Sequence, residues 1–184
     1  MRELVFLLEE ESAKAMIEGL VPRLVPADIL VRCVPFEGKQ DLQKQLARKI
    51  RGYQNPDARF VVLQDQDSHD CKVLKEHLVA LCQQSGRAGV LVRIACRELE
   101  SFYLADLAAV EKGLDLPGLA RRQARRKFRA PDALGNAAEE LIRLTGGRYQ
   151  KVSGSRAIGK HLDPANERST SFKNLVDGIR RACA

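Results

Sequence analysis

The chain has 184 residues, of which 45% are hydrophobic, and a formal net charge of +7. This size and composition suit one compact domain with an appendage. No stretch approaches 18 uninterrupted apolar residues, and the amino terminus lacks the pattern of a signal peptide, so we expect a cytoplasmic protein without a membrane partner. Its five cysteines show no C-x-x-C spacing, which argues against a disulfide framework or a structural zinc site.

Four short apolar runs follow one another along the first half of the chain, at residues 4–8, 29–34, 60–63 and 90–96. Helical patterns lie between them, the first preceded by Ser12 and the third by Asp70 as expected N-caps. Alternation of strands and helices predicts the α/β class, with a four-stranded, mainly parallel sheet and helices on both of its faces.

The character of the sequence changes after residue 107. Helix-forming stretches such as 137–144 and 172–181 are joined by Gly, Pro and Ser, and no strong strand run appears. Residues 108–184 carry 16 Lys and Arg against 8 Asp and Glu, whereas residues 1–107 carry 15 against 16. We therefore expect an α/β domain at 1–107 and a basic helical extension at 108–184 that packs on it and faces a polyanionic partner.

Acidic residues follow three of the four predicted strands. Glu9 opens a run of three glutamates after the first strand, Asp65 and Asp67 follow the third, and Glu98 and Glu100 follow the fourth. The carboxyl ends of parallel strands meet at one edge of a sheet, so these acids are expected to gather there. In an extended chain Asp65 and Asp67 point to one side, whereas on a helix Glu98 and Glu100 lie about 200° apart and only one can face the site.

Clustered carboxylates repel one another unless a cation lies between them, and oxygen ligands favour Mg²⁺ or Mn²⁺ over zinc. We expect Glu9, Asp65, Asp67 and Glu100 to share such a metal, with Glu98 as a further candidate. The simpler alternative stays open at this point. Glutamates in a first helical turn and a D-x-D in a turn both occur for structural reasons alone.

These residues carry a family resemblance. A strand that ends in Glu and a later strand that ends in Asp-x-Asp resemble the Toprim fold of topoisomerases, primases and overcoming-lysogenization-defect nucleases. The segments LLEEESAKAMIEGLVPRL, VVLQDQDSHDCKVLK, RIACRELESFYLAD and GRYQKVSGSRAI resemble, almost end to end, a bacterial domain-of-unknown-function family, number 4276, which is grouped with Toprim proteins.

The resemblance implies a Toprim/Rossmann-like fold and a Mg²⁺-dependent phosphoryl-transfer site. Glu9 would then be the general acid/base, and Asp65 and Asp67 would be metal ligands. Many Toprim proteins have Glu-Gly at the first strand end, and here Glu10 replaces that glycine. The resemblance also suggests DNA repair or anti-phage defence beside a partner ATPase of the ABC type.

A basic segment, RRQARRKFR, holds six positive charges in nine residues. Its members are Arg121, Arg122, Arg125, Arg126, Lys127 and Arg129. The segment is read either as a solvated helix surface or as a patch that follows the phosphates of DNA or RNA without sequence preference, which Lys151, Arg156 and Lys160 could extend.

The leading hypothesis is a metal-dependent nuclease or related phosphodiester-processing enzyme. The second is a catalytically degenerate Toprim-like module that binds nucleic acid or a partner ATPase without cutting. A receiver-like phosphoacceptor domain also has acids after its first and third strands, but it needs a lysine after a fifth strand, and the sequence predicts no fifth strand.

Overall fold

The computed structural model describes residues 2–184, and its centre is a four-stranded sheet. The strands are β1 (Glu3–Leu8), β2 (Leu30–Pro35), β3 (Ala58–Asp65) and β4 (Val90–Ala95). They lie in the order β2-β1-β3-β4 and every pair is parallel, with Phe6 opposite Cys33 on one side and Val61 on the other. The four predicted strands and their parallel arrangement are confirmed, and all four carboxyl ends meet at one edge.

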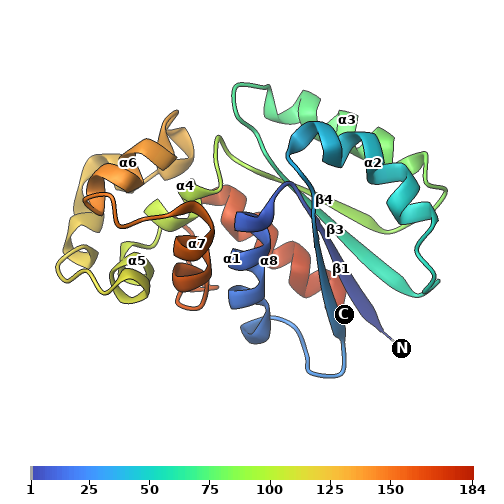
Figure 1. Ribbon diagram of the computed structural model, residues 1–184, viewed down its shortest axis with the longest axis horizontal. Coiled ribbons are helices and arrows are strands. Elements are labelled where there is room, and N and C mark those ends of the chain that lie inside the picture. The colour runs from blue at the N-terminus through green and yellow to red at the C-terminus, as the bar shows by residue number, and fades with distance from the viewer. Residues whose placement is uncertain (1) are drawn as a thin grey trace.

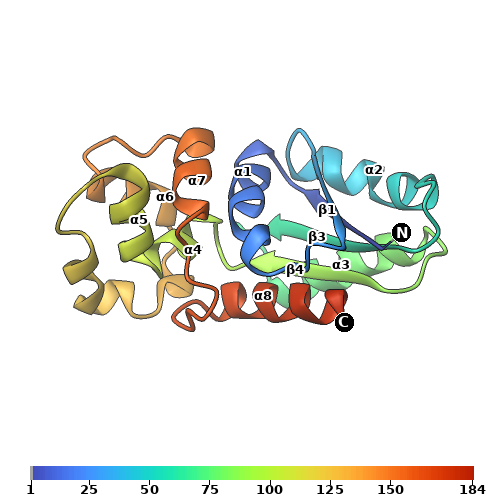
Figure 2. The same cartoon turned by 90° about the horizontal axis from the view of Figure 1, so that it is seen from below.

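Helices cover both faces of the sheet, as the buried residues of β1 show. Leu4, Phe6 and Leu8 pack with α1 (Glu11–Leu20) and α8 (Thr170–Cys183), whereas Val5 and Leu7 pack with α2 (Lys39–Arg51) and α3 (Cys71–Gln83). The continuous apolar run LVFLL is explained by this burial, because alternate side chains enter two separate cores. Figure 2 shows α8 along one side of the sheet and α2 along the other.

The helix starts differ in how well they follow the expected caps. Asp70 caps α3, accepting the backbone N–H groups of Lys72 and Val73 at 2.9 and 3.0 Å. The N-cap of α1 is Glu10 and not Ser12, so the expectation for Ser12 was wrong. Ser12 lies in the first turn, where its hydroxyl donates to Glu10 Oε1 at 2.8 Å. Glu10 therefore keeps its side chain beside the helix start.

The rest of the chain is helical, as expected. It contains α4 (Glu100–Leu104), α5 (Leu107–Leu114), α6 (Ala137–Leu144) and α7 (Lys151–Gly159), with short 3₁₀ turns at Ala120–Ala124, Arg126–Phe128 and Pro131–Ala133. Figure 1 shows these helices as a group beside the sheet, with α7 next to α1, and α8 returning to pack on the sheet. One apolar core runs from β1 through α1 and α4 to α7 and α8.

The division into residues 1–107 and 108–184 stays a prediction. Both parts contribute side chains to that one apolar core. Within the described residues, no helix combines the length and the apolar character that crossing a membrane requires.

Candidate functional site

Glu9 and Asp65 meet where β1 and β3 end. Glu9 follows the last residue of β1, and Asp65 is the last residue of β3. Glu9 Oε2 accepts the backbone N–H of Asp65 at 3.0 Å, while the Glu9 N–H donates to the carbonyl of Leu63 at 3.3 Å. The parallel pairing of Leu8 with Leu63 brings both strand ends to one edge, where Glu9 and Asp65, one position apart in register, come together.

Both carboxyl groups are harder to ionise than usual. Burial raises the pKa of Glu9, and the charges of Asp67 and Glu10 add to the rise, against the opposing N–H of Asp65 and ammonium of Lys39. Burial also raises the pKa of Asp65 well above its ordinary value, and the charges of Glu9 and Glu100 act in the same direction. A backbone N–H, that of Leu99, donates to Asp65 Oδ2 at 3.1 Å and opposes the rise.

Glu100 and Glu98 are separated by the start of α4. Glu100, the first residue of that helix, is only 2% exposed. Its Oε1 accepts a hydrogen bond from the hydroxyl oxygen of Tyr149 at 2.8 Å. Burial raises its pKa, and the Tyr149 hydrogen bond opposes this. Glu98 instead accepts the N–H of Ala138 at 2.8 Å, at the start of α6. The structure therefore brings Glu100 toward Asp65 and directs Glu98 to the extension.

Asp67 does not continue the strand. Its φ is 51°, in the left-handed region, so the expectation of an extended chain through Asp65 and Asp67 was wrong. The turn begins because β3 ends at Asp65, after which Gln66 N–H donates to Ala95 and Asp67 N–H to Arg97. Asp67 Oδ2 then pairs with Lys39 Nζ at 2.8 Å.

Glu10 occupies the position where many Toprim proteins have glycine. Its φ of −157° and ψ of 173° are ordinary extended values that any residue adopts, so the backbone path does not require glycine here. Glu10 Oε1 pairs with Lys151 Nζ at 2.6 Å. Burial lowers the pKa of Lys151, but the hydrogen bond and charge of Glu10, together with Glu100 and Asp65, outweigh burial and raise it.

Two lysines and two tyrosines of this site were not assigned to it from the sequence. The sequence indicates Lys151 only as an extension of the basic segment, and it assigns no role in a site to Lys39, Tyr103 or Tyr149. Lys151 and Tyr149 come from the far end of the chain and reach the acids because α7 packs on α1. A local motif cannot reveal such a contact, and only a pattern of co-variation between distant positions could have done so.

The donor chemistry of the acids fits a hard divalent cation. Glu9, Glu10, Asp65 and Glu100 supply carboxylate oxygens whose mutual repulsion contributes to the raised pKa of Asp65. The hydroxyl of Tyr103 is fully buried near Asp65, Glu10 and Glu100 and has no hydrogen-bond partner of good geometry within the described residues.

Two lysines neutralise part of the negative charge of these acids. In residues 2–184, no three His, Cys, Asp or Glu side chains are already arranged around a common metal position. Lys39 and Lys151 each hold one carboxylate of the group. A metal that used the oxygens of Asp67 or Glu10 would therefore have to displace an ammonium group.

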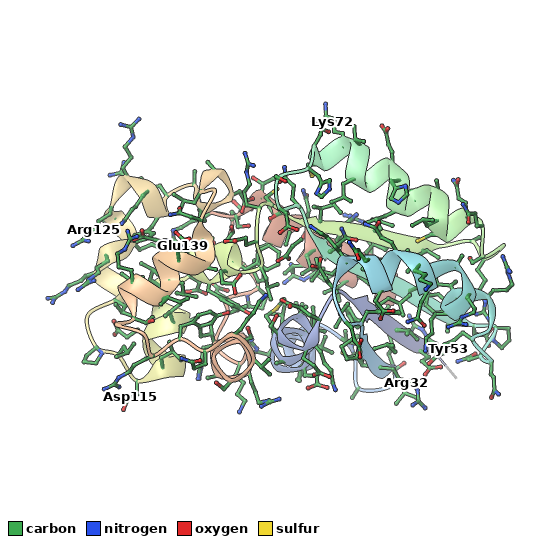
Figure 3. The ribbon with its side chains drawn as sticks, turned by 45° about the horizontal axis from the view of Figure 1, so that its top comes forward. Arg32, Tyr53, Lys72, Asp115, Arg125 and Glu139 are labelled. Atoms are coloured by element: carbon green, nitrogen blue, oxygen red, sulfur yellow. The ribbon has the colours of Figure 1, made fainter. Side chains whose placement is uncertain are left out.

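The basic segment forms two short 3₁₀ turns rather than the helix surface considered from the sequence. Lys127 pairs with Glu140 and Arg129 Nε donates to the carbonyl of Ala124 at 3.0 Å, whereas Arg125 and Arg126 are exposed. Figure 3 shows Arg125 at the outer edge of the extension. Phe128 is buried beneath the segment and fixes it to the core.

One protein family matches almost the whole chain. The sequence profile of the domain of unknown function DUF4276 matches residues 8–180. The chain belongs to this family. Among curated proteins no relative matches.

A solved structure shares the fold. The C-terminal region of the Burkholderia pseudomallei OLD protein is 18% identical, with a TM-score of 0.57, and the match covers 100% of this chain and 98% of that one. At this identity the likeness concerns the fold alone. The predicted Toprim-like α/β fold of the DUF4276 chain is thereby confirmed.

Proposed function

We propose that this DUF4276 protein is a metal-dependent, phosphodiester-processing enzyme, a nuclease of the Toprim type acting on DNA or RNA. The observation that carries the proposal is the meeting of Glu9 with Asp65 at the carboxyl ends of adjacent strands, inside a group of acids with raised pKa values. Groups with perturbed pKa values are concentrated at catalytic sites, because chemistry demands arrangements that folding alone does not favour.

The chain's own residues have distinct parts in this proposal. Asp65, Glu9 and Glu100 would hold Mg²⁺ or Mn²⁺, with Asp67 joining once Lys39 leaves it, and Glu98 remaining with α6. The chemistry that such a cation supplies when bound is polarisation of the scissile phosphate. Glu9 moves the proton as general acid/base, because its raised pKa makes it easier to protonate than an ordinary glutamate.

Lys151 and the basic segment would act on the substrate. Lys151 projects from the first turn of α7 beside Glu10, where its ammonium can meet the negative charge of the reacting phosphate. Arg121, Arg122, Arg125, Arg126, Lys127 and Arg129 would bind the strand through its phosphates, without reading sequence.

The cellular setting is proposed by analogy. The structural neighbour is the C-terminal region of a larger protein. We propose that the DUF4276 chain works in the cytoplasm with a separate partner ATPase, in DNA repair or anti-phage defence. Purification of the tagged chain from its host, with identification of any ATPase that accompanies it, tests this directly, and the absence of an ATPase from the complex would contradict the pairing.

The catalytic proposal is tested by cleavage of labelled single- and double-stranded DNA and RNA in Mg²⁺ and Mn²⁺. Glu9→Gln and Asp65→Asn should each abolish cleavage, and the double variant should be no worse than the worse single one, because residues that act as a unit are not additive. Glu139→Gln, an exposed change on α6, is the control and should cleave as the parent does.

A second function is favoured by one observation, the neutralisation of Asp67 and Glu10 by lysines. On this alternative the chain is a degenerate module that binds nucleic acid or an ATPase and cuts nothing. Calorimetric titration with Mn²⁺ separates the two functions. Binding that disappears in Asp65→Asn supports the enzyme, and no binding at millimolar Mn²⁺ supports the module.

A further inference from the structure

The ion pair between Lys39 and Asp67 joins two loops on either side of Glu9. Lys39 is the first residue of α2, and it follows Gly38, whose φ is 98°. The Gly38 N–H donates to the carbonyl of Glu9 at 2.9 Å, so the loop that carries Lys39 is fixed to the end of β1. From there Lys39 Nζ reaches Asp67 Oδ2 at 2.8 Å.

Asp67 is held from the opposite side. Its left-handed backbone is uncommon for a residue with a Cβ, and its N–H donates to the carbonyl of Arg97 at 2.8 Å. Such backbone conformations persist where the surrounding structure imposes them, and they occur often at functional sites. The backbone thus presents the Asp67 carboxylate next to Glu9 whether or not the lysine is paired with it.

The pair is poorly suited to a purely structural role. The side chains of Lys39 and Asp67 are 40% and 38% exposed, and ion pairs with this exposure contribute little to stability. Their charges nevertheless act on Glu9, since Asp67 raises its pKa and Lys39 lowers it. The ammonium therefore lies within the electrostatic field of the carboxylate group at a position where a cation is favoured.

We propose that Lys39 is an internal counter-ion that occupies Asp67 until a divalent cation replaces it, and that the released ammonium then binds a phosphate of the nucleic acid. This inference rests on the proposed function and adds to it a substrate-binding residue and an order of binding. Replacement is feasible because the bond lost is weak, whereas a divalent ion carries twice the charge of the ammonium and would be attracted by several of the carboxylates.

Release has a defined consequence for the lysine. Its ammonium has three donors on a flexible four-carbon chain and, once unpaired beside the site, is free to contact a phosphate oxygen. Metal and nucleic acid should then strengthen each other's binding, and by linkage the coupling must be equal in both directions. In the parent protein part of this coupling passes through Lys39.

The test uses the full chain, freed of metal with chelator, and compares the parent with Lys39→Met. The matched control is Lys44→Met, which removes a lysine from the same helix, where the neighbouring acid is Asp41. Calorimetry should show Mn²⁺ binding about three- to fivefold tighter in Lys39→Met, because the competitor is gone and an exposed pair of this kind is worth up to about that factor. Lys44→Met should bind Mn²⁺ as the parent does.

Nucleic-acid binding gives the second readout, measured by fluorescence anisotropy on a 20-nucleotide single strand. In Mg²⁺, Lys39→Met should bind several-fold more weakly, and the slope of log affinity against log salt should fall by about one. In chelator, where Lys39 is paired with Asp67, the loss of binding in the variant should be much smaller than in Mg²⁺. If Lys39→Met does not fold, Lys39→Gln replaces it in both measurements.

The outcomes separate the two proposals. If the parent binds Mn²⁺ and both lysine variants bind it with the same affinity, the role of Lys39 is overturned while the proposed function stands. Equal loss of nucleic-acid binding in Mg²⁺ and in chelator would also overturn it, because Lys39 would then contact phosphate without being released by metal. If the parent binds no Mn²⁺, both proposals fail.

Discussion

At the scale of single residues, the acids at the ends of β1 and β3 are placed against their own electrostatic preference. Asp65 is the extreme case, since burial, Glu9 and Glu100 all disfavour its charged form. An acid whose folded pKa is raised destabilises the folded state when pH exceeds that pKa, and the cost falls as pH drops toward the unfolded value. Such a cost is expected where a cation has to bind.

At pH 7.5 in chelator, the free energy of unfolding of Asp65→Asn should therefore exceed that of the parent by about 1 kcal/mol. The variant should melt at a higher temperature. Asparagine keeps an oxygen for the N–H of Leu99 and removes the charge. The difference should shrink toward pH 5, because the folded parent then takes up a proton that the unfolded chain does not yet hold. Thermal melts across this pH range measure it. A pH-independent difference would show that charge is not its cause.

Tyr149→Phe should have the opposite effect on stability. The hydroxyl of Tyr149 is the side-chain donor to the buried carboxyl of Glu100, at 2.8 Å. Its removal leaves that group without this donor and should cost about 1–3 kcal/mol, measured by urea denaturation at pH 7. The loss of stability should be smaller when Tyr149→Phe is made in the Glu100→Gln variant, since the carboxylate is absent there. Equal losses in both backgrounds would mean that Tyr149 acts only through packing.

At the scale of elements, the contact between α1 and α7 decides whether the extension contributes to the site. Gly19 and Gly159 let the two helices approach until their backbones nearly touch. A Cβ added at Gly159 would lie 2.7 Å from the carbonyl oxygen of Met16, which cannot move without shifting α1. The same packing fixes the start of α7, and thus Lys151, beside Glu10.

Gly159→Ala should destabilise the protein by about 1–3 kcal/mol, because the extra methyl is forced against backbone. In an ordinary helix position the same change stabilises by about 1 kcal/mol, so the sign of the effect identifies the contact. Gly135→Ala, where an added Cβ meets nothing within 4 Å, is the control and should be nearly neutral. Urea denaturation measures both, and a stabilised Gly159→Ala would contradict this account of the packing.

At the scale of the whole molecule, charge and core are distributed differently. The apolar core is continuous between the sheet and residues 108–184, whereas the positive charge is concentrated in the latter. The acids lie at the junction of the two parts, between β1, β3, α4 and α7 (Figure 1). The positive extension would thus attract a nucleic-acid strand to a surface that adjoins the carboxylates, whose own negative charge a bound cation has to offset.

Charge reversal of both Arg125 and Arg126 should weaken nucleic-acid binding and reduce its log–log salt slope by about two, without changing sequence preference. Both side chains are exposed, so the fold should be unaffected. Lys72→Glu on α3, well away from the extension in Figure 3, is the control. Anisotropy titrations from 50 to 300 mM salt measure the slopes, and an unchanged slope in the double variant would remove this segment from the interface.

The sequence alone determined the sheet, because strands buried on both faces must be continuously apolar and those runs are local features. It also predicted which edge of the sheet collects Glu9 and Asp65, since parallel strands end together. Only the tertiary structure decided the remaining members of the site. Asp67 turns away from the strand, Glu98 goes to α6, and Lys151 and Tyr149 arrive through α7. These placements depend on backbone turns and on contacts between segments that lie far apart in the sequence, which no local pattern of residues encodes.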